Sequence, residues 1–196
     1  MRRRGAAAKS VVMSARRTTI LALLITAAGA ALLLAMGRPA ICTCGTVELW
    51  VSQGDSPKTS QMLADWYSPS HVIHGFLFYW LLWLGFRKWP VERRFLVALL
   101  LELSWEILEN TDWAIQRYRE ATIAIGYTGD SVLNTLSDIA MMALGFWLAR
   151  RLPAWLIVAL AVALELAALL AVRDNLTLNI WMFLFPTEAI RAWQAG

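Results

Sequence analysis

Three apolar segments of the chain carry ionisable and amide side chains at helical spacing. The rows are His71 with His74, then Glu102, Glu106 and Glu109, then Asp130, Asn134 and Asp138. Residues three or four apart share one face of a helix, so each row predicts a polar face on an otherwise apolar helix. An ionised side chain at the bilayer centre costs roughly 2.5–3.5 kcal/mol, and such residues usually mark functional sites.

The residue types in these rows are those that bind metals and transfer protons. We predict a divalent-cation site whose ligands are His71, His74, Glu102, Asn134 and Asp138. Oxygen ligands suit Mg²⁺, Ca²⁺ or Mn²⁺, and the imidazoles extend the range to Zn²⁺ or Fe²⁺. Glu106 or Glu109 would be the general base for metal-assisted hydrolysis or transfer at a lipid or cell-envelope headgroup. Asp130 precedes its segment directly and is expected to cap that helix.

Two other functions fit the same residues. Carboxylate rows serve as proton relays, which favours a proton- or ion-coupled transporter. A buried polar network can also fix helix packing in a membrane scaffold without catalysis. The deepest acids, Glu102 and Glu165, leave no visible polar path to the other half of the membrane, which counts against transport. The residues do not decide whether the protein is an enzyme.

Polar residues outside these rows give weaker signals. Arg173 and Asn175 follow an apolar segment, where an arginine can hold the phosphate or carboxylate of a headgroup, or equally pair with a neighbouring acid. Cys42 and Cys44 are two residues apart, and a disulfide at that separation is strained. Two cysteines alone do not make a metal site, so the sequence assigns them no function.

The segments that carry the rows are long enough to cross a bilayer. The chain has 196 residues, of which 59% are hydrophobic and 16% charged, whereas about one quarter of a soluble domain is charged. We predict an all-α, polytopic transmembrane helix bundle, with a single membrane domain at 18–196 behind a basic segment at 1–17. Its five spans are 18–36, 71–86, 95–110, 131–149 and 154–172, with a sixth if the short stretch 176–185 crosses. The first could also be a secretory signal, but no small-residue cleavage site follows it.

Basic residues indicate an orientation. With the N-terminus in the cytoplasm, the inside segments hold six basic residues in 1–17, four in 87–94 and two at 150–151, against six outside. This matches the positive-inside rule, and it places the three polar rows at similar depths in the outer half. The expected partner is the lipid bilayer. The basic residues flank apolar runs and form no separate domain, which excludes nucleic acid, and the sequence indicates no protein partner.

Several motifs cover most of the chain after the basic segment. They are CxCG after the first span, ADWYSPSHVIHGFLFYW, ELSWEILEN, GYTGDSVLNTLSD, and RDNLTLN with AIRAWQAG. Over residues 32–196 the chain resembles a family of bacterial inner-membrane proteins known only by a serial number as uncharacterised. The resemblance implies a multi-pass protein of the bacterial inner membrane and no activity. More loosely, the order of His, ExxE and GD…N…D is similar to VanZ-like membrane proteins, from which no function transfers.

Overall fold

A computed structural model describes residues 13–54, 56–122, 124 and 126–196. Over these residues the chain is all-α, with eight helices and no strands, which confirms the predicted fold class. The helices are α1 (Ala15–Ala35), α2 (Ser68–Gly85), α3 (Val91–Glu109), α4 (Asp112–Ala121), α5 (Val132–Arg151), α6 (Ala154–Val172), α7 (Leu176–Leu184) and α8 (Glu188–Ala195). Residues 1–12 of the predicted basic segment lie outside the described part.

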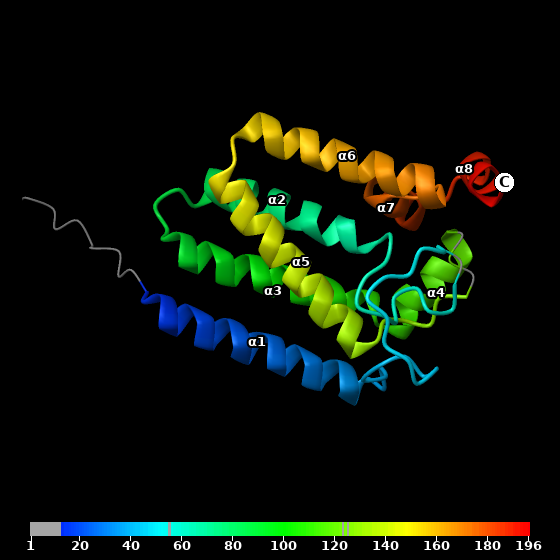
Figure 1. The fold of residues 1–196 in the computed structure, drawn as a ribbon, viewed down its shortest axis with the longest axis horizontal. Coiled ribbons are helices and arrows are strands. Elements are labelled where there is room, and N and C mark those ends of the chain that lie inside the picture. The colour runs from blue at the N-terminus through cyan, green and yellow to red at the C-terminus, as the bar shows by residue number, and fades with distance from the viewer. Residues whose placement is uncertain (1–12, 55, 123, 125) are drawn as a thin grey trace, which may run out of the picture.

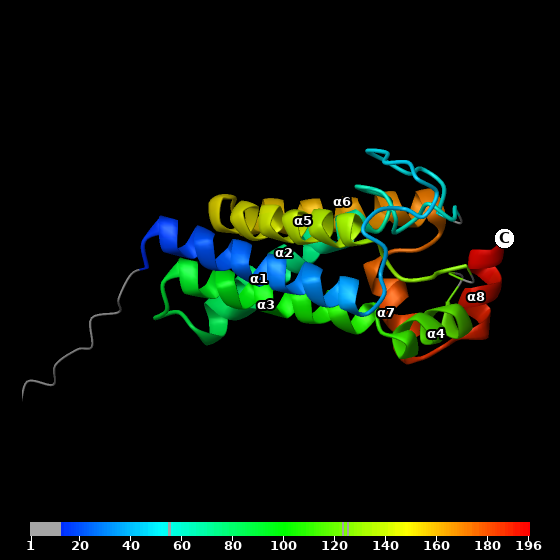
Figure 2. The same ribbon diagram turned by 90° about the horizontal axis from the view of Figure 1, so that it is seen from below.

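Five long helices run along the long axis of the molecule and alternate in direction (Figure 1). They are α1, α2, α3, α5 and α6, and each overlaps one predicted span. The short α2–α3 and α5–α6 connections lie together at one end of the bundle. The other end carries the long loop 36–67 together with α4, α7 and α8 (Figures 1 and 2). The ends of the helices that carry the polar rows therefore meet under the long loops.

Three of the five long helices, α1, α5 and α6, are long and apolar enough to cross a membrane. Only 17% of the apolar window of α1 and 11% of that of α6 is buried in the protein, against 50% for α5. Helices α1 and α6 thus form the outside of the bundle. Helices α2 and α3 fall short on composition because they carry the histidines, the glutamates and the basic pair Arg93–Arg94.

Two glycines bring α2 and α5 into backbone contact. A Cβ atom on Gly75 would lie 2.2 Å from the carbonyl oxygen of Met142, and one on Gly145 would lie 2.1 Å from that of Val72. Only a residue without a side chain permits this approach. The close crossing sets His71 of α2 beside Asp138 of α5, one helical turn away.

The apolar core lies on the connection side of the polar rows. Its buried members come from α2, α3 and α5, namely Leu82, Ala98, Leu99, Leu103, Ile139, Met142 and Phe146. On α2 and α5 these residues follow the polar rows, and on α3 most of them precede Glu102. The bundle therefore has an apolar half and a polar half.

The long loops contain more helix than the sequence predicted. Segment 111–130, between two predicted spans, begins with α4, which Thr111 caps through its side chain. Helix α8 was not predicted at all. Both are short and amphipathic, so they lack the bilayer-length apolar run on which the prediction rested. Helix α7 has nine residues, within the predicted short stretch 176–185.

The loop 36–67 folds over the start of α5. The backbone N–H groups of Ser131 and Val132 donate to the carbonyls of Ser60 and Pro39, at 3.0 and 2.8 Å. Cys42 and Met62 are buried in a small cluster of this loop, and a disulfide joins Cys42 to Cys44. The loop is thereby fixed against the polar end of the bundle.

Candidate cation site and cavity

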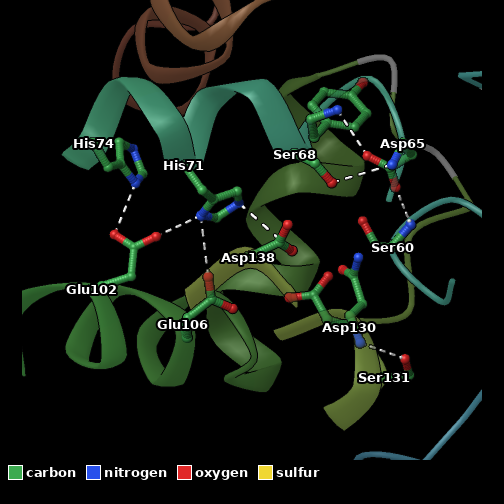
Figure 3. A network of polar contacts seen from close by, with 12 residues as sticks. Ser60, Asp65, Ser68, His71, His74, Glu102, Glu106, Asp130, Ser131 and Asp138 are labelled. Atoms are coloured by element: carbon green, nitrogen blue, oxygen red, sulfur yellow. Dashed lines mark hydrogen bonds and ion pairs between the residues drawn. The ribbon is translucent and has the colours of Figure 1, made fainter. Parts of the chain in front are cut away.

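The two histidines of α2 share one carboxylate of α3. His71 Nδ1 lies 2.6 Å from Glu102 Oε1, and His74 Nδ1 lies 3.0 Å from Glu102 Oε2 (Figure 3). An ionised carboxylate only accepts hydrogen bonds, so each imidazole donates through Nδ1. The Nε2 atom of each ring then carries the lone pair that can bind a metal.

Glu106 and Asp138 also lie beside His71, Glu106 near the nitrogen that contacts Glu102 and Asp138 near the other ring nitrogen (Figure 3). His71 Nδ1 is 3.3 Å from Glu106 Oε1, and His71 Nε2 is 3.8 Å from Asp138 Oδ2. Ligand atoms of these three residues lie within 4.8 Å of one another, and the same holds for His71, His74 and Glu102. Two overlapping sets of possible metal ligands therefore share His71.

Two carboxylate oxygens in this cluster are buried without a hydrogen bond. Glu106 Oε1 and Asp138 Oδ1 have no hydrogen-bond partner among the described residues, and neither does Thr135 Oγ1, three residues before Asp138. A buried acceptor without a partner costs about 1–3 kcal/mol, and more if it is charged. These atoms are therefore suited to a cation or a shared proton.

A cavity of about 370 Å³ lies between this cluster and the long loops. His71, His74 and Asp138 line it, whereas Glu102 and Glu106 are not among its lining residues. The acids in its lining are Asp65, Glu109, Asp130 and Asp138. Among the described lining residues there is no lysine or arginine, so the cavity is strongly acidic.

Asp130 does not cap α5 as the sequence predicted. The cap is Ser131, whose hydroxyl accepts from the N–H of Asn134. The Asp130 carboxylate instead accepts from Asn110 Nδ2 at 2.6 Å and from the Tyr127 hydroxyl at 2.9 Å. Burial raises the pKa of Asp130 above its ordinary value, although these hydrogen bonds act in the opposite direction. Because Ser131 caps α5, the Asp130 side chain is not needed as a cap and lines the cavity instead.

Of the remaining predicted site residues, Asn134 lies at the cavity and Arg173 and Asn175 do not. Asn134 lines the cavity, but its side-chain amide donates to the Met62 carbonyl at 3.0 Å and so ties the loop to α5. Arg173 donates to the Trp193 carbonyl, and Asn175 caps α7 by accepting from the N–H of Leu178. Neither Arg173 nor Asn175 is among the lining residues. Their predicted headgroup role stays a prediction, and their placement does not favour it.

Glu165 contacts the start of α7 and is not among the residues that line the cavity. Its carboxylate accepts from the N–H groups of Leu176 and Thr177 at 3.0 and 3.1 Å. These are free N–H groups of the first turn of α7, where negative charge is stabilising. Glu165 therefore fixes the start of α7.

Asp174, between α6 and α7, is a network residue that the sequence did not single out. It accepts from Tyr67, Asn179, Gln194 and the N–H of Asn175. Burial nevertheless raises the pKa of Asp174 to about 6. The network connects the start of α2 with α7 and α8.

Aromatic residues of the cavity wall were also missed. They are Tyr67, Trp105, Tyr118 and Tyr127. Trp105 follows Glu102 by three residues on the same helical face, which is a signal that the sequence did contain. The tyrosines lie in loops or in α4, whose fold over the bundle leaves no periodic pattern in the sequence.

Comparison with known proteins identifies relatives but no activity. Residues 33–196 match a family described as "Protein of unknown function (DUF2585)". A UPF0314 protein of Agrobacterium fabrum is 52% identical over 163 residues, covering 83% of this chain and 82% of the relative. A UPF0314 protein of Paracoccus denitrificans is 51% identical over 164 residues, covering 84% and 85%. No solved structure matches, and these comparisons do not bear on the looser similarity to VanZ-like proteins.

Proposed function

We propose, for a chain that belongs to the DUF2585 family of proteins of unknown function, that its His/Glu/Asp cluster binds a divalent cation within a membrane. The observation that carries the proposal is a pair of buried carboxylate oxygens without a hydrogen bond, Glu106 Oε1 and Asp138 Oδ1. Both belong to carboxylates beside His71, since Glu106 Oε1 is 3.3 Å from its Nδ1 and Asp138 Oδ2 is 3.8 Å from its Nε2. A buried charge is stable only when it is paired or coordinates a metal. A cation between these groups would satisfy both oxygens at once.

The ligand assignment follows from the shared carboxylate. Glu102 engages Nδ1 of both histidines and so orients them, as acidic groups behind metal-binding histidines commonly do. We assign His71 Nε2 and Asp138 as first ligands, with Glu106 completing the set. His74 Nε2 and the amide oxygen of Asn134 are further donors on the cavity side. A mixed nitrogen and oxygen set suits Zn²⁺, Mn²⁺ or Fe²⁺ better than Ca²⁺.

A cation bound at this site could act on a molecule held in the cavity. A bound divalent metal lowers the pKa of its water and polarises an ester or phosphoryl oxygen. We assign the general base to Glu109, because it lines the cavity and Glu106 does not. Hydrolysis or transfer at a lipid or envelope headgroup is the reaction class that this arrangement supports.

The setting we propose is the bacterial inner membrane, crossed five times, with the cavity facing outward. The support is the five antiparallel long helices and the basic residues at the connection end. Arg87 and Arg93 lie over the rings of Trp83 and Trp89, 4.2 and 3.9 Å from their centroids. Basic residues are in excess on the cytoplasmic side of membrane proteins, and Trp gathers at both membrane interfaces.

The main test is metal analysis of the detergent-purified chain. Protein stripped with EDTA and reloaded with Zn²⁺ or Mn²⁺ should carry near-stoichiometric metal, which Asp138→Asn and His71→Ala should lose while keeping their helix content. Glu92→Gln, at the other end of α3, is the matched control. A folded wild-type protein that takes up no metal contradicts the proposal.

A metal-free network that only fixes helix packing is the remaining alternative from a different class. Glu106→Gln separates the two in metal-free protein. If the network is structural, the substitution should cost about 1–3 kcal/mol of stability. If the site exists to bind a cation, removing an unpaired buried charge should leave stability unchanged or raised. Transport is disfavoured because the apolar core closes the bundle beyond the cluster.

A further inference from the structure

The cavity wall above the cation site combines aromatic rings with acids. Its rings are Tyr67, Trp105, Tyr118 and Tyr127. Tyr118 and Tyr127 pack edge to face with centroids 5.5 Å apart. Aromatic faces attract cations, and they do so most strongly where water is excluded.

Two of the three tyrosines are hydrogen-bonded to a carboxylate. The Tyr127 hydroxyl donates to Asp130 at 2.9 Å and the Tyr67 hydroxyl donates to Asp174 at 3.3 Å, while Tyr118 and Glu109 both line the cavity. Burial raises the pKa of Tyr118 and of Tyr127, so both hydroxyls remain protonated donors. The pairs hold two of the rings in place and leave carboxylate oxygens at the cavity wall.

The described residues supply no lysine or arginine to this wall. Among the described residues, Glu109 and Asp130 take part in no ion pair with a lysine or arginine. Arg38, on the neighbouring loop, is engaged elsewhere, since it donates to the Thr128 carbonyl at 2.9 Å and pairs with Asp112 at 3.4 Å. A single divalent cation at His71 would leave Glu109 and Asp130 uncompensated.

We infer that this wall binds a primary ammonium group, held by Glu109 and Asp130 and enclosed by the tyrosines and Trp105. An ammonium has three N–H donors and no acceptor, which fits a wall of carboxylate and hydroxyl oxygens. A quaternary amine could use the rings but would leave these acceptors without donors.

The ammonium site does not require the cation site. Where both are occupied, the phosphate of an ethanolamine-type headgroup would lie at the metal while its amine lies at Glu109, and that part rests on the proposed function. In that complex Glu109 holds the amine and does not act as the general base. The ligand class is then an amine-bearing phosphoryl headgroup, whether carried by a lipid or free.

Native mass spectrometry of the full-length chain in detergent tests the inference. Phosphatidylethanolamine, phosphatidylcholine and phosphatidylglycerol are titrated onto EDTA-treated and Zn²⁺-loaded protein. The ethanolamine lipid differs from the choline lipid only by the methyl groups on nitrogen, and the glycerol lipid has no amine. We expect at least tenfold tighter binding of the ethanolamine lipid, lost in Glu109→Gln and retained in Glu92→Gln.

The outcomes separate the two proposals. Preference for the ethanolamine lipid in metal-free protein supports the ammonium site even if no metal is ever found. Competition by soluble phosphoethanolamine identifies the headgroup alone as sufficient, and its absence identifies the lipid as the source. Equal binding of the three lipids by wild type, or an unchanged preference in folded Glu109→Gln, overturns the inference. Should Glu109→Gln not fold, the wild-type comparison decides alone.

Discussion

Glu102 is buried between two imidazoles and gives one carboxylate oxygen to each. The identity of this residue therefore sets the tautomer of both histidines. A glutamine of nearly the same shape would accept from one imidazole but present its own N–H to the other. One histidine would have to rotate or move its proton to Nε2, the atom assigned to the metal.

We therefore expect Glu102→Gln to fold and to bind a cation about 10–100-fold more weakly, with the stoichiometry preserved at saturation. A competition titration with a chelating dye measures the affinity. Asp138→Asn, a change at an assigned ligand, should instead lose stoichiometric binding. Wild-type affinity in Glu102→Gln would show that the carboxylate does not orient the pair.

Asp174, which lies outside the cation site, should make the stability of the protein depend on pH. Its pKa is raised to about 6 from an ordinary 3.8, chiefly by burial. The folded state therefore binds the proton more tightly than the unfolded chain does. The resulting stabilisation is complete below about pH 4 and is lost as the pH rises through 6, a change of at most about 3 kcal/mol.

Thermal unfolding of wild type and Asp174→Asn between about pH 4 and pH 7.5 checks this effect. The stability of wild type relative to the variant should fall as the pH rises, because the amide does not titrate. A difference that stays constant over this range would contradict the raised pKa.

At the residue scale the sequence predicted the members of the cluster better than their roles. Helical spacing placed each row on one face of its helix, and the cost of polar groups in lipid favours turning these faces together, as the structure does for His71, Glu102 and Asp138. It could not show that Glu102 engages both Nδ1 atoms. Nor could it show that Ser131 replaces Asp130 as the cap, since both residue types cap helices.

At the scale of the elements, the crossing of α2 and α5 controls the site. Gly75 and Met142 are one turn beyond His71 and Asp138, so their contact sets the distance between the two candidate ligands. The sequence held both glycines, but nothing in their spacing revealed that they face each other across two helices.

Gly75→Ala tests this contact. Alanine gains about 1 kcal/mol of helix propensity, but its Cβ would lie 2.2 Å from a backbone oxygen, so the helices must separate. We expect a net loss of about 1–3 kcal/mol and weaker metal binding. Thermal unfolding and metal titration report the two effects.

Gly85→Ala is the matched control in the same helix, because a Cβ there meets nothing within 4 Å. It should leave stability unchanged or slightly raised, with full metal binding. If both variants behave alike, the close crossing does not position the site.

At the scale of the whole molecule, hydropathy selects three helices where our proposal has five crossing helices, and the difference has a physical reason. Helices α2 and α3 carry the polar rows, and these rows lower their apolar character relative to α1, α5 and α6. The same buried side chains face the interior of the bundle, where lipid does not reach them. The antiparallel order of five long helices is thus the stronger argument for five spans.

The antiparallel order of the five long helices predicts on which side of the membrane the C-terminus lies. Helix α7 has nine residues, or about 14 Å at 1.5 Å per residue, which is too short for a hydrocarbon core of about 30 Å. The C-terminus should therefore lie on the same side as the cavity, opposite the α2–α3 connection. With the basic residues inside, that side is the outer one.

Reporter fusions decide the topology. Alkaline phosphatase fused after Gly196 should be active, and green fluorescent protein fused at Lys88 in the α2–α3 connection should be fluorescent. A fluorescent C-terminal fusion together with an active phosphatase at Lys88 would invert the protein and place the cavity in the cytoplasm. Fluorescence at both positions would mean that the α2–α3 connection and the C-terminus share one side, which the antiparallel five-helix order does not allow.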